Sequence, residues 1–142
     1  MSSSILKTTI MLLDGKFKYL GTGRNDAKIT VDYFPPYGDG EGFTSLELFL
    51  VSLSTCAGSS ITMLLKKMNK DIKRFQVISE GDRREEHPTC FTKVTLNIEI
   101  ETDAEEDDIN KAIKMSEEKY CPVWAMIKGN VEVQIKVNRI KL

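Results

Sequence analysis

Three cysteines, Cys56, Cys90 and Cys121, are the residues of this sequence best suited to covalent chemistry. They are odd in number and far apart, and no Cys-x-x-Cys pair occurs, which excludes a zinc ribbon or a thioredoxin-type motif. The single histidine, His87, cannot build a histidine-based metal site, so we expect neither a metal nor a cofactor. In a reducing compartment such cysteines are either buried hydrophobic residues or reactive thiols.

Two of these cysteines lie in helical contexts that bear on reactivity. Cys56 is inside an expected long helix, among the small residues of 52–60, which leave room for a ligand or for another helix. Composition alone favours a buried Cys56 that acts as a small hydrophobe. Cys121 precedes Pro122, which suits the first position of a short helix over 123–127. Cys121 is then the N-cap, where free amides and the helix dipole favour a thiolate, although a packed thiol fits equally well.

Cys90 and Glu47 have simple structural interpretations. Cys90 begins an expected strand in phase with Val94, so we expect it to face the core and to be inert. Glu47 is a candidate site carboxylate, but it follows Thr44 by three residues in a capping-box pattern. Nine helical residues separate Glu47 from Cys56, which puts the two on opposite faces.

Three arginines are the candidate cations. Arg24 lies in the turn 21–26 and is interpreted as a solvated charge. Arg83 and Arg84 lie in a charged hairpin next to acidic residues, where surface ion pairing explains them. Trp124 is interpreted as a core or interface residue.

The hydrophobic periodicity predicts an α+β fold in the order β-β-β-α-β-β-α-α-β, with antiparallel sheet and the helices on one face. A second capping box, Thr102 with Glu105, opens the second helix, whose buried face is expected to include Ser116 and Tyr120. The first helix is apolar around most of its circumference, which indicates a buried helix that a dimer partner helps to cover. The expected strands are 10–13, 17–19, 29–31, 73–80, 91–101 and 131–140, and the expected helices are 45–69, 102–120 and 123–127.

The composition is that of one ordinary globular domain, 1–142. Hydrophobic residues make up 41% and charged residues 29% of the chain. With a net charge of -1 and no basic block, nucleic acid and anionic membranes are poor partners. We find no apolar run of about 18 residues and no basic segment before an apolar stretch at the N-terminus. We therefore expect a cytoplasmic protein without a membrane span.

These patterns resemble the OsmC/Ohr superfamily over nearly the whole chain. The first-cysteine helix of that superfamily is similar to SLELFLVSLSTCAGSSI, and its second-cysteine motif is similar to SEEKYCPVWAMI. The loop and strand between them in the small OsmC-like branch resemble GDRREEHPTCFTKVTLNIEI. The spacing between Cys56 and Cys121 is also similar to that of the family.

The resemblance implies an intertwined homodimer with central helices packed between outer sheets. It also implies a peroxidase that reduces organic hydroperoxides in oxidative stress defence. Cys56 is then the peroxidatic thiol and Cys121 the resolving thiol, and an external dithiol, such as a lipoylated protein, reduces their disulfide.

The sequence departs from the hydroperoxide reductases of the family in its activating residues. Those enzymes place an arginine on the N-terminal strands and a glutamate ten residues before the first cysteine. Here Leu46 occupies the latter position and Glu47 follows it, as in the OsmC-like branch. Arg24 matches the family's arginine only loosely, and Arg83 or Arg84 is our alternative cation.

An organic substrate also requires an apolar pocket near Cys56. We expect its walls to include Phe34, Phe49, Leu53 and Trp124. A second hypothesis is a non-catalytic dimeric module that binds a small apolar ligand on the same fold.

Overall fold

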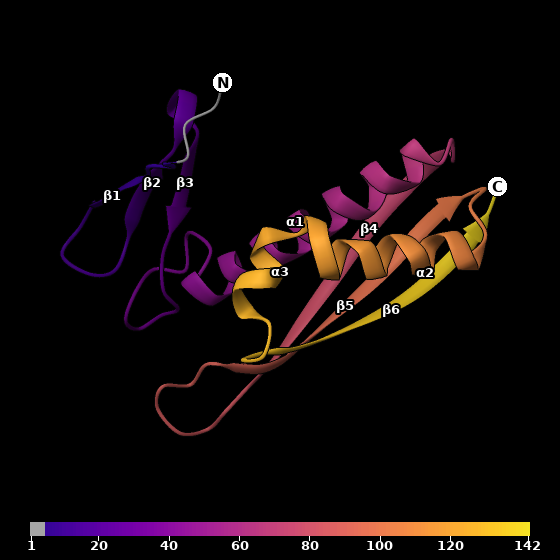
Figure 1. Cartoon of the computed structure of the whole chain (residues 1–142). Helices are drawn as coiled ribbons and strands as arrows, with labels where there is room; N and C mark the ends of the chain where they lie inside the picture. The colour runs from indigo at the N-terminus through magenta and orange to yellow at the C-terminus, as the bar shows by residue number, and fades with distance from the viewer. Residues whose placement is uncertain (1–4) are drawn as a thin grey trace. The chain divides into compact units, whose positions relative to one another are not determined.

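The structure is a computed structural model that describes residues 5–142 (Figure 1). By its internal contacts the chain divides into two compact units, Met1–Phe49 and Leu50–Leu142. Helix α1 (Ser45–Lys67) begins in the first unit and continues through the second. The order of helices and strands is the predicted β-β-β-α-β-β-α-α-β.

The first unit holds a small antiparallel sheet of order β1-β2-β3. Its strands are β1 (Thr9–Leu12), β2 (Tyr19–Thr22) and β3 (Lys28–Val31). The connection between β1 and β2 is wider than a two-residue hairpin turn, and the Asp14 carboxylate accepts hydrogen bonds from two loop amides within it, at 2.9 and 3.2 Å. The expected second strand is therefore displaced, and Phe17 lies in the loop.

Asp32 organises the expected loop after β3. Its buried carboxylate accepts hydrogen bonds from the amides of Tyr33, Asp39 and Glu41, at 2.7, 3.2 and 3.1 Å. Desolvation raises the pKa of Asp32, but these amides and the Lys18 ammonium outweigh it and lower the pKa below its usual value. Lys18 also pairs with Asp39 and Glu41, so its positive charge offsets part of the negative charge of Asp32, Asp39 and Glu41.

The second unit is built on a three-stranded sheet of order β4-β5-β6. Its strands are β4 (Ile72–Arg83), β5 (Phe91–Thr102) and β6 (Glu132–Lys141). β4 and β5 form an antiparallel hairpin, whereas β6 runs parallel to β5, so the prediction of a wholly antiparallel sheet was wrong for this pair. The reason is the crossover through α2 (Glu106–Met115) and α3 (Pro122–Ile127), which returns the chain to the starting end of the sheet.

Helix α2 begins later than predicted. Glu105 is the N-cap and forms a reciprocal capping box with Asp108, whereas we had assigned the cap to Thr102. Thr102 ends β5 instead, where its buried hydroxyl donates to the Asp71 carbonyl at 2.6 Å and accepts from the Ala104 amide at 3.1 Å. Because the Thr102 hydroxyl already bonds two backbone groups at the end of the strand, it is not available to cap a helix.

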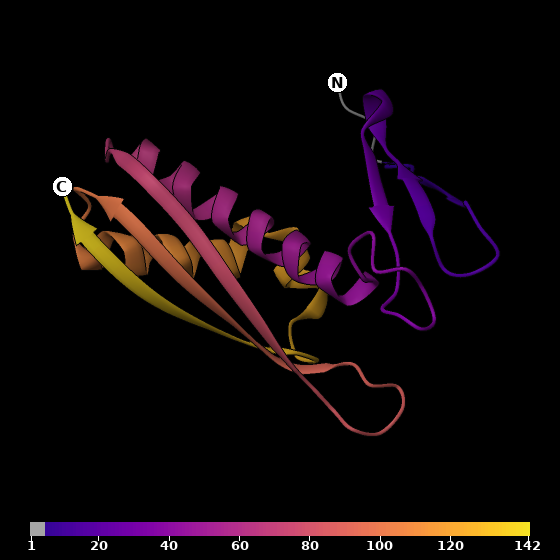
Figure 2. The ribbon, with the colours of Figure 1, turned by 180° about the vertical axis from the view of Figure 1, so that it is seen from behind.

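One face of α1 forms the core of the second unit with the sheet and α2. The helices lie on the same side of the sheet in both views (Figures 1 and 2). The core cluster contains residues of α1, β5, α2 and the connection between β5 and α2: Ile61, Leu64, Leu65, Ile98, Ile100, Ala104, Ile109 and Ala112.

Helix α1 is apolar well beyond this buried face. By length and composition alone, α1 is apolar enough to cross a membrane, because its mean hydropathy is 1.8 over a window of 18 residues. The expectation that the chain has no apolar run of about this length was wrong. Only 39% of that window is buried within the chain. Its inner face packs on the sheet, as expected for a core helix of a folded unit.

We expect Leu65→Ala to destabilise the second unit strongly. Leu65 is fully buried, and removing a buried leucine side chain costs about 2–5 kcal/mol through lost transfer energy and a residual cavity. Urea unfolding monitored by circular dichroism measures the change. The neighbouring Lys66→Ala is the control and should stay within about 0.5 kcal/mol of the parent, because Lys66 is exposed. Equal losses in the two variants would contradict this packing.

Candidate functional site

Cys56 lies in the middle of α1 and is partly buried. A shallow groove of about 470 Å³ opens beside it. Most of its lining comes from α1 positions that share a helix face with Cys56, and one residue comes from α3. The lining residues are Ser52, Thr55, Cys56, Ser59, Ser60, Met63 and Val123.

Cys121 is the N-cap of α3, as the sequence predicted. Pro122 occupies the first helical position, and the Cys121 carbonyl accepts the Ala125 amide at 3.0 Å. The Cys121 sulfur accepts the Trp124 amide at 3.4 Å, and both side chains are buried. The thiol is therefore fixed at the start of the helix with only 2% of the residue exposed.

Cys56 and Cys121 lie close enough together for the Cys56 thiol to affect the pKa of Cys121. Both are free thiols. Burial raises the pKa of Cys121 to about 11, and the hydrogen bond with Cys56 adds to the rise, while the amides of Trp124 and Val123 act in the opposite direction. Of the two interpretations of Cys121, the packed thiol fits the structure better than the thiolate, because desolvation outweighs the amides.

Cys90 is exposed in the loop before β5, so the prediction that it faces the core was wrong. Its carbonyl accepts the Arg84 amide at 3.0 Å and its amide donates to Pro88 at 2.8 Å. These bonds belong to the end of the β4–β5 hairpin, where strand alternation no longer determines which side a residue faces.

The four charged candidates have local roles. Glu47 is exposed and forms the predicted capping box, in which its carboxylate accepts the Thr44 amide at 2.9 Å. Arg24 is exposed in a 3₁₀ turn of the first unit (Arg24–Asp26). The guanidinium of Arg83 donates to the Thr89 carbonyl at 2.7 Å, and Arg84 pairs with Glu86 at 3.4 Å. An activating role for any of them stays a prediction.

The four expected wall residues do not appear among those that line the Cys56 groove in the described chain. Leu53 and Trp124 are too deeply buried, because they pack in the interior of the second unit. Phe34 is exposed in the first unit, and Phe49 is the last residue of that unit. Residues three, four or seven positions from Cys56 share its helix face, and this spacing in the sequence identifies four of the residues that line the groove: Ser52, Ser59, Ser60 and Met63.

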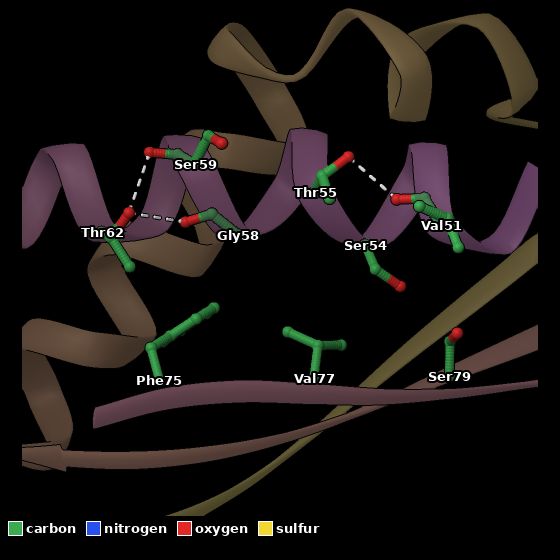
Figure 3. Close-up of a pocket in the computed structure, with 9 residues that line it drawn as sticks. All are labelled: Val51, Ser54, Thr55, Gly58, Ser59, Thr62, Phe75, Val77 and Ser79. Atoms are coloured by element: carbon green, nitrogen blue, oxygen red, sulfur yellow. Dashed lines mark hydrogen bonds between the residues drawn. The ribbon is translucent and has the colours of Figure 1, made fainter. Parts of the chain in front are cut away.

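A second groove of about 430 Å³ separates α1 from β4 (Figure 3). Phe75, Val77 and Ser79 of β4 face α1 across it, and the side chain of Ser54 points towards the strand. The Ser54 hydroxyl oxygen is buried and has no hydrogen-bond partner in the described chain. Thr55 and Ser59 line both grooves, so the two lie on either side of one ridge of α1.

Comparison with known proteins identifies the relatives of this chain. The sequence profile of the OsmC-like protein family matches residues 38–136. Protein YhfA of Escherichia coli is 28% identical over 89 residues, covering 62% of this chain and 66% of YhfA, slightly less than two thirds of its length. A hypothetical protein of Aquifex aeolicus superposes with a TM-score of 0.86 at 26% identity over 99% of both chains. An organic hydroperoxide resistance protein, OsmC, of Legionella pneumophila superposes with a TM-score of 0.74 at 18% identity, covering 97% of this chain and 99% of its own.

We expect Cys121 to resist alkylation by iodoacetamide until high pH. The thiolate is the nucleophile, and the raised pKa keeps Cys121 protonated, so half of its reactivity should appear only near pH 11. Peptide mass spectrometry across a pH series resolves each cysteine, and the exposed Cys90 is the internal reference for the reagent. A midpoint for Cys121 below pH 9 would contradict the buried, protonated thiol.

Proposed function

We propose that this chain, which belongs to the OsmC-like protein family, is a thiol-dependent peroxidase that reduces organic hydroperoxides and serves in oxidative stress defence. The observation that carries the proposal is the contact between the Cys56 and Cys121 thiols, from two helices distant in sequence. The similarity in fold to a Legionella pneumophila protein described as an organic hydroperoxide resistance protein supports the substrate class.

We infer the roles of the two thiols from their unequal environments. Cys121 is buried and protonated at neutral pH. A peroxide is attacked by a thiolate that it can reach. Cys56 is also the cysteine that reaches the open groove. Cys56 is thus the peroxidatic residue and Cys121 the resolving one.

The first step is a two-electron transfer at Cys56. Its thiolate attacks the distal oxygen of the hydroperoxide, the O–O bond breaks, and the alkoxide takes a proton to leave as an alcohol. Cys56 becomes a sulfenic acid. Resolution follows when the Cys121 sulfur attacks that sulfenic sulfur, forming the Cys56–Cys121 disulfide and releasing water. An external dithiol, such as that of a lipoylated protein, then reduces the disulfide by thiol exchange and is itself oxidised to a disulfide.

The groove beside Cys56 suits an alkyl hydroperoxide. Met63 and Val123 offer apolar surface for the alkyl group, while the hydroxyl of Ser59 offers a polar contact at the rim. Met is well adapted to irregular apolar ligands because its unbranched side chain is flexible. A bulky substrate such as cumene hydroperoxide should therefore be consumed faster than hydrogen peroxide.

A homodimer completes this proposal. Only 39% of the apolar window of α1 is buried by its own chain, although the helix is apolar enough to prefer an interior. The open groove between α1 and β4 lies on this uncovered surface. A second subunit that covers the surface would bury the apolar side chains. The proposed compartment is the cytoplasm, where the three thiols stay reduced between turnovers.

Cysteine substitutions should separate the roles kinetically. Cys56→Ser should abolish turnover, because serine is not ionised at neutral pH and cannot accept the peroxide oxygen. Cys121→Ser should allow a single turnover, leaving a sulfenic acid at Cys56 that then over-oxidises. Cys90→Ser is the matched control and should retain activity and stability, because Cys90 is exposed. Steady-state and single-turnover assays with cumene hydroperoxide and a dithiol, followed by intact mass spectrometry, measure these outcomes.

A non-catalytic module that binds a small apolar ligand is the second candidate. The two open grooves along α1, one at Cys56 and one at β4, favour it. Equal loss of activity in all three variants, or no peroxide turnover by the parent chain with any dithiol, would support this alternative over the peroxidase.

We expect the chain to sediment as a dimer at micromolar concentration. Obligate interfaces often bury more than about 2,000 Å², and the uncovered apolar surface of α1 requires cover of this kind. Val51→Glu, at an exposed position of α1 that lines the β4 groove, should shift the equilibrium towards monomer. Lys66→Glu is the control for the added charge. A folded parent monomer at micromolar concentration would refute the dimer.

A further inference from the structure

The buried residues at the end of α2 are unevenly spaced. Ile109, Ala112, Ser116 and Cys121 are all buried, so the steps between them are three, four and then five residues. The sequence pattern had placed Tyr120 on this face, one helical step after Ser116. Instead Tyr120 is 37% exposed, and Cys121 takes the inward position.

A regular α-helix cannot make the last step. At 3.6 residues per turn, five residues rotate the chain by roughly 500°, which leaves Cys121 roughly 140° away from the face of Ser116. The chain adopts a π-helical turn at Ser116–Tyr120, in which the Cys121 amide donates to the Ser116 carbonyl at 2.9 Å. The wider turn absorbs the additional residue, so that the side chain of Cys121 faces inward.

Ser116 also touches the helix that carries Cys56. It has no exposed surface, and its hydroxyl donates a long hydrogen bond of 3.4 Å to the carbonyl of Ala57, the residue after Cys56. Ala57 is itself 1% exposed, so two small side chains allow the end of α2 to approach α1 closely. Ser116 thus contacts the chain next to one cysteine through its side chain and the other cysteine through its carbonyl.

We infer that Ser116 and the π-helical turn it begins are a positioning device that holds Cys121 in register with Cys56 for disulfide formation. Neither a substrate nor a reductant contacts Ser116 in this role, so it is a positioning residue. The inference concerns the proposed redox pair and rests on the proposed function for its purpose. The redox equilibrium that tests it, however, requires no peroxide.

The first test lengthens the turn by one residue. Inserting Ala between Glu118 and Lys119, both exposed, adds one residue to the parent turn and so rotates Cys121 by roughly 100° away from its position in the parent. In oxidised and reduced dithiothreitol, the parent chain should form the Cys56–Cys121 disulfide and the insertion variant should lose it. Glu118→Ala is the matched control and should behave like the parent. Peptide mapping identifies the linked cysteines, and circular dichroism verifies folding.

A second variant tests the contact if the insertion prevents folding. Ser116→Val adds branched bulk where no surface is exposed, which should push the end of α2 away from α1. We expect the equilibrium constant for disulfide formation to fall about tenfold, equivalent to about 30 mV for this two-electron couple. Ser116→Ala keeps the small side chain and should stay within about threefold, because it loses only one long hydrogen bond.

The control for a purely structural effect is Thr102→Val, which removes another fully buried hydroxyl. It should lower stability without changing the disulfide equilibrium. An unchanged equilibrium in Ser116→Val, or a disulfide in the insertion variant as stable as that of the parent, would overturn the inference. A parent that forms the disulfide but never reduces hydroperoxides would refute the proposed function alone, leaving the positioning role intact.

Discussion

The packing of α1 on the β4-β5-β6 sheet determines where the chemistry of the second unit can occur. Gly58 is one turn from Ser54 on the side of α1 that meets β4, and a Cβ atom there would lie 3.0 Å from the Phe75 ring. Glycine in a helix interior costs about 1 kcal/mol relative to alanine. The close approach of the Phe75 ring explains why glycine rather than alanine occupies position 58. Because the same helix carries Cys56 two residues earlier, the approach of α1 to the sheet also fixes the backbone of the reactive thiol. Val123 of α3 also lines the groove beside this thiol.

The same packing makes the two thiols chemically unequal. Cys121 is enclosed between α1 and α3 and loses nearly all contact with water, which favours its neutral form. Cys56 is only partly buried and borders an open groove. A redox pair needs this division, because the attacking thiol must meet a substrate and the second thiol must wait nearby without reacting first. The helix N-terminus at α3 therefore contributes less to ionisation than to fixing the position of Cys121 through the Trp124 amide.

Local sequence signals predicted those parts of the structure that depend on neighbours along the chain. The alternation of Val94 and Ile98 on β5, the Thr44–Glu47 cap and the N-cap at Cys121 each need only a few adjacent residues, and the structure contains all of them. The parallel direction of β6 was missed, because strand direction follows from the length and path of a crossover. Tyr120 was misplaced, since a π-helical turn leaves no mark in a pattern read at 3.6 residues per turn. The groove at Cys56 was misassigned to bulky apolar residues, because the expected organic substrate suggested an apolar pocket, whereas small hydroxyl residues make up much of its lining.

Hydroxyl residues give α1 an outer surface that is less polar than its composition implies. Thr55 donates to the Val51 carbonyl at 2.8 Å and Thr62 to the Gly58 carbonyl at 2.9 Å, so both satisfy their hydroxyls within the helix. Once such a hydroxyl is bonded inward, covering it requires no further partner and costs little desolvation energy. The methyl groups that remain outward can pack like those of valine. Ser54 differs, because its buried hydroxyl oxygen has no partner within the described chain. The outer surface of α1 therefore has most of its hydrogen bonds already made, so an apolar partner can cover it, whereas the Ser54 hydroxyl is already enclosed within the chain.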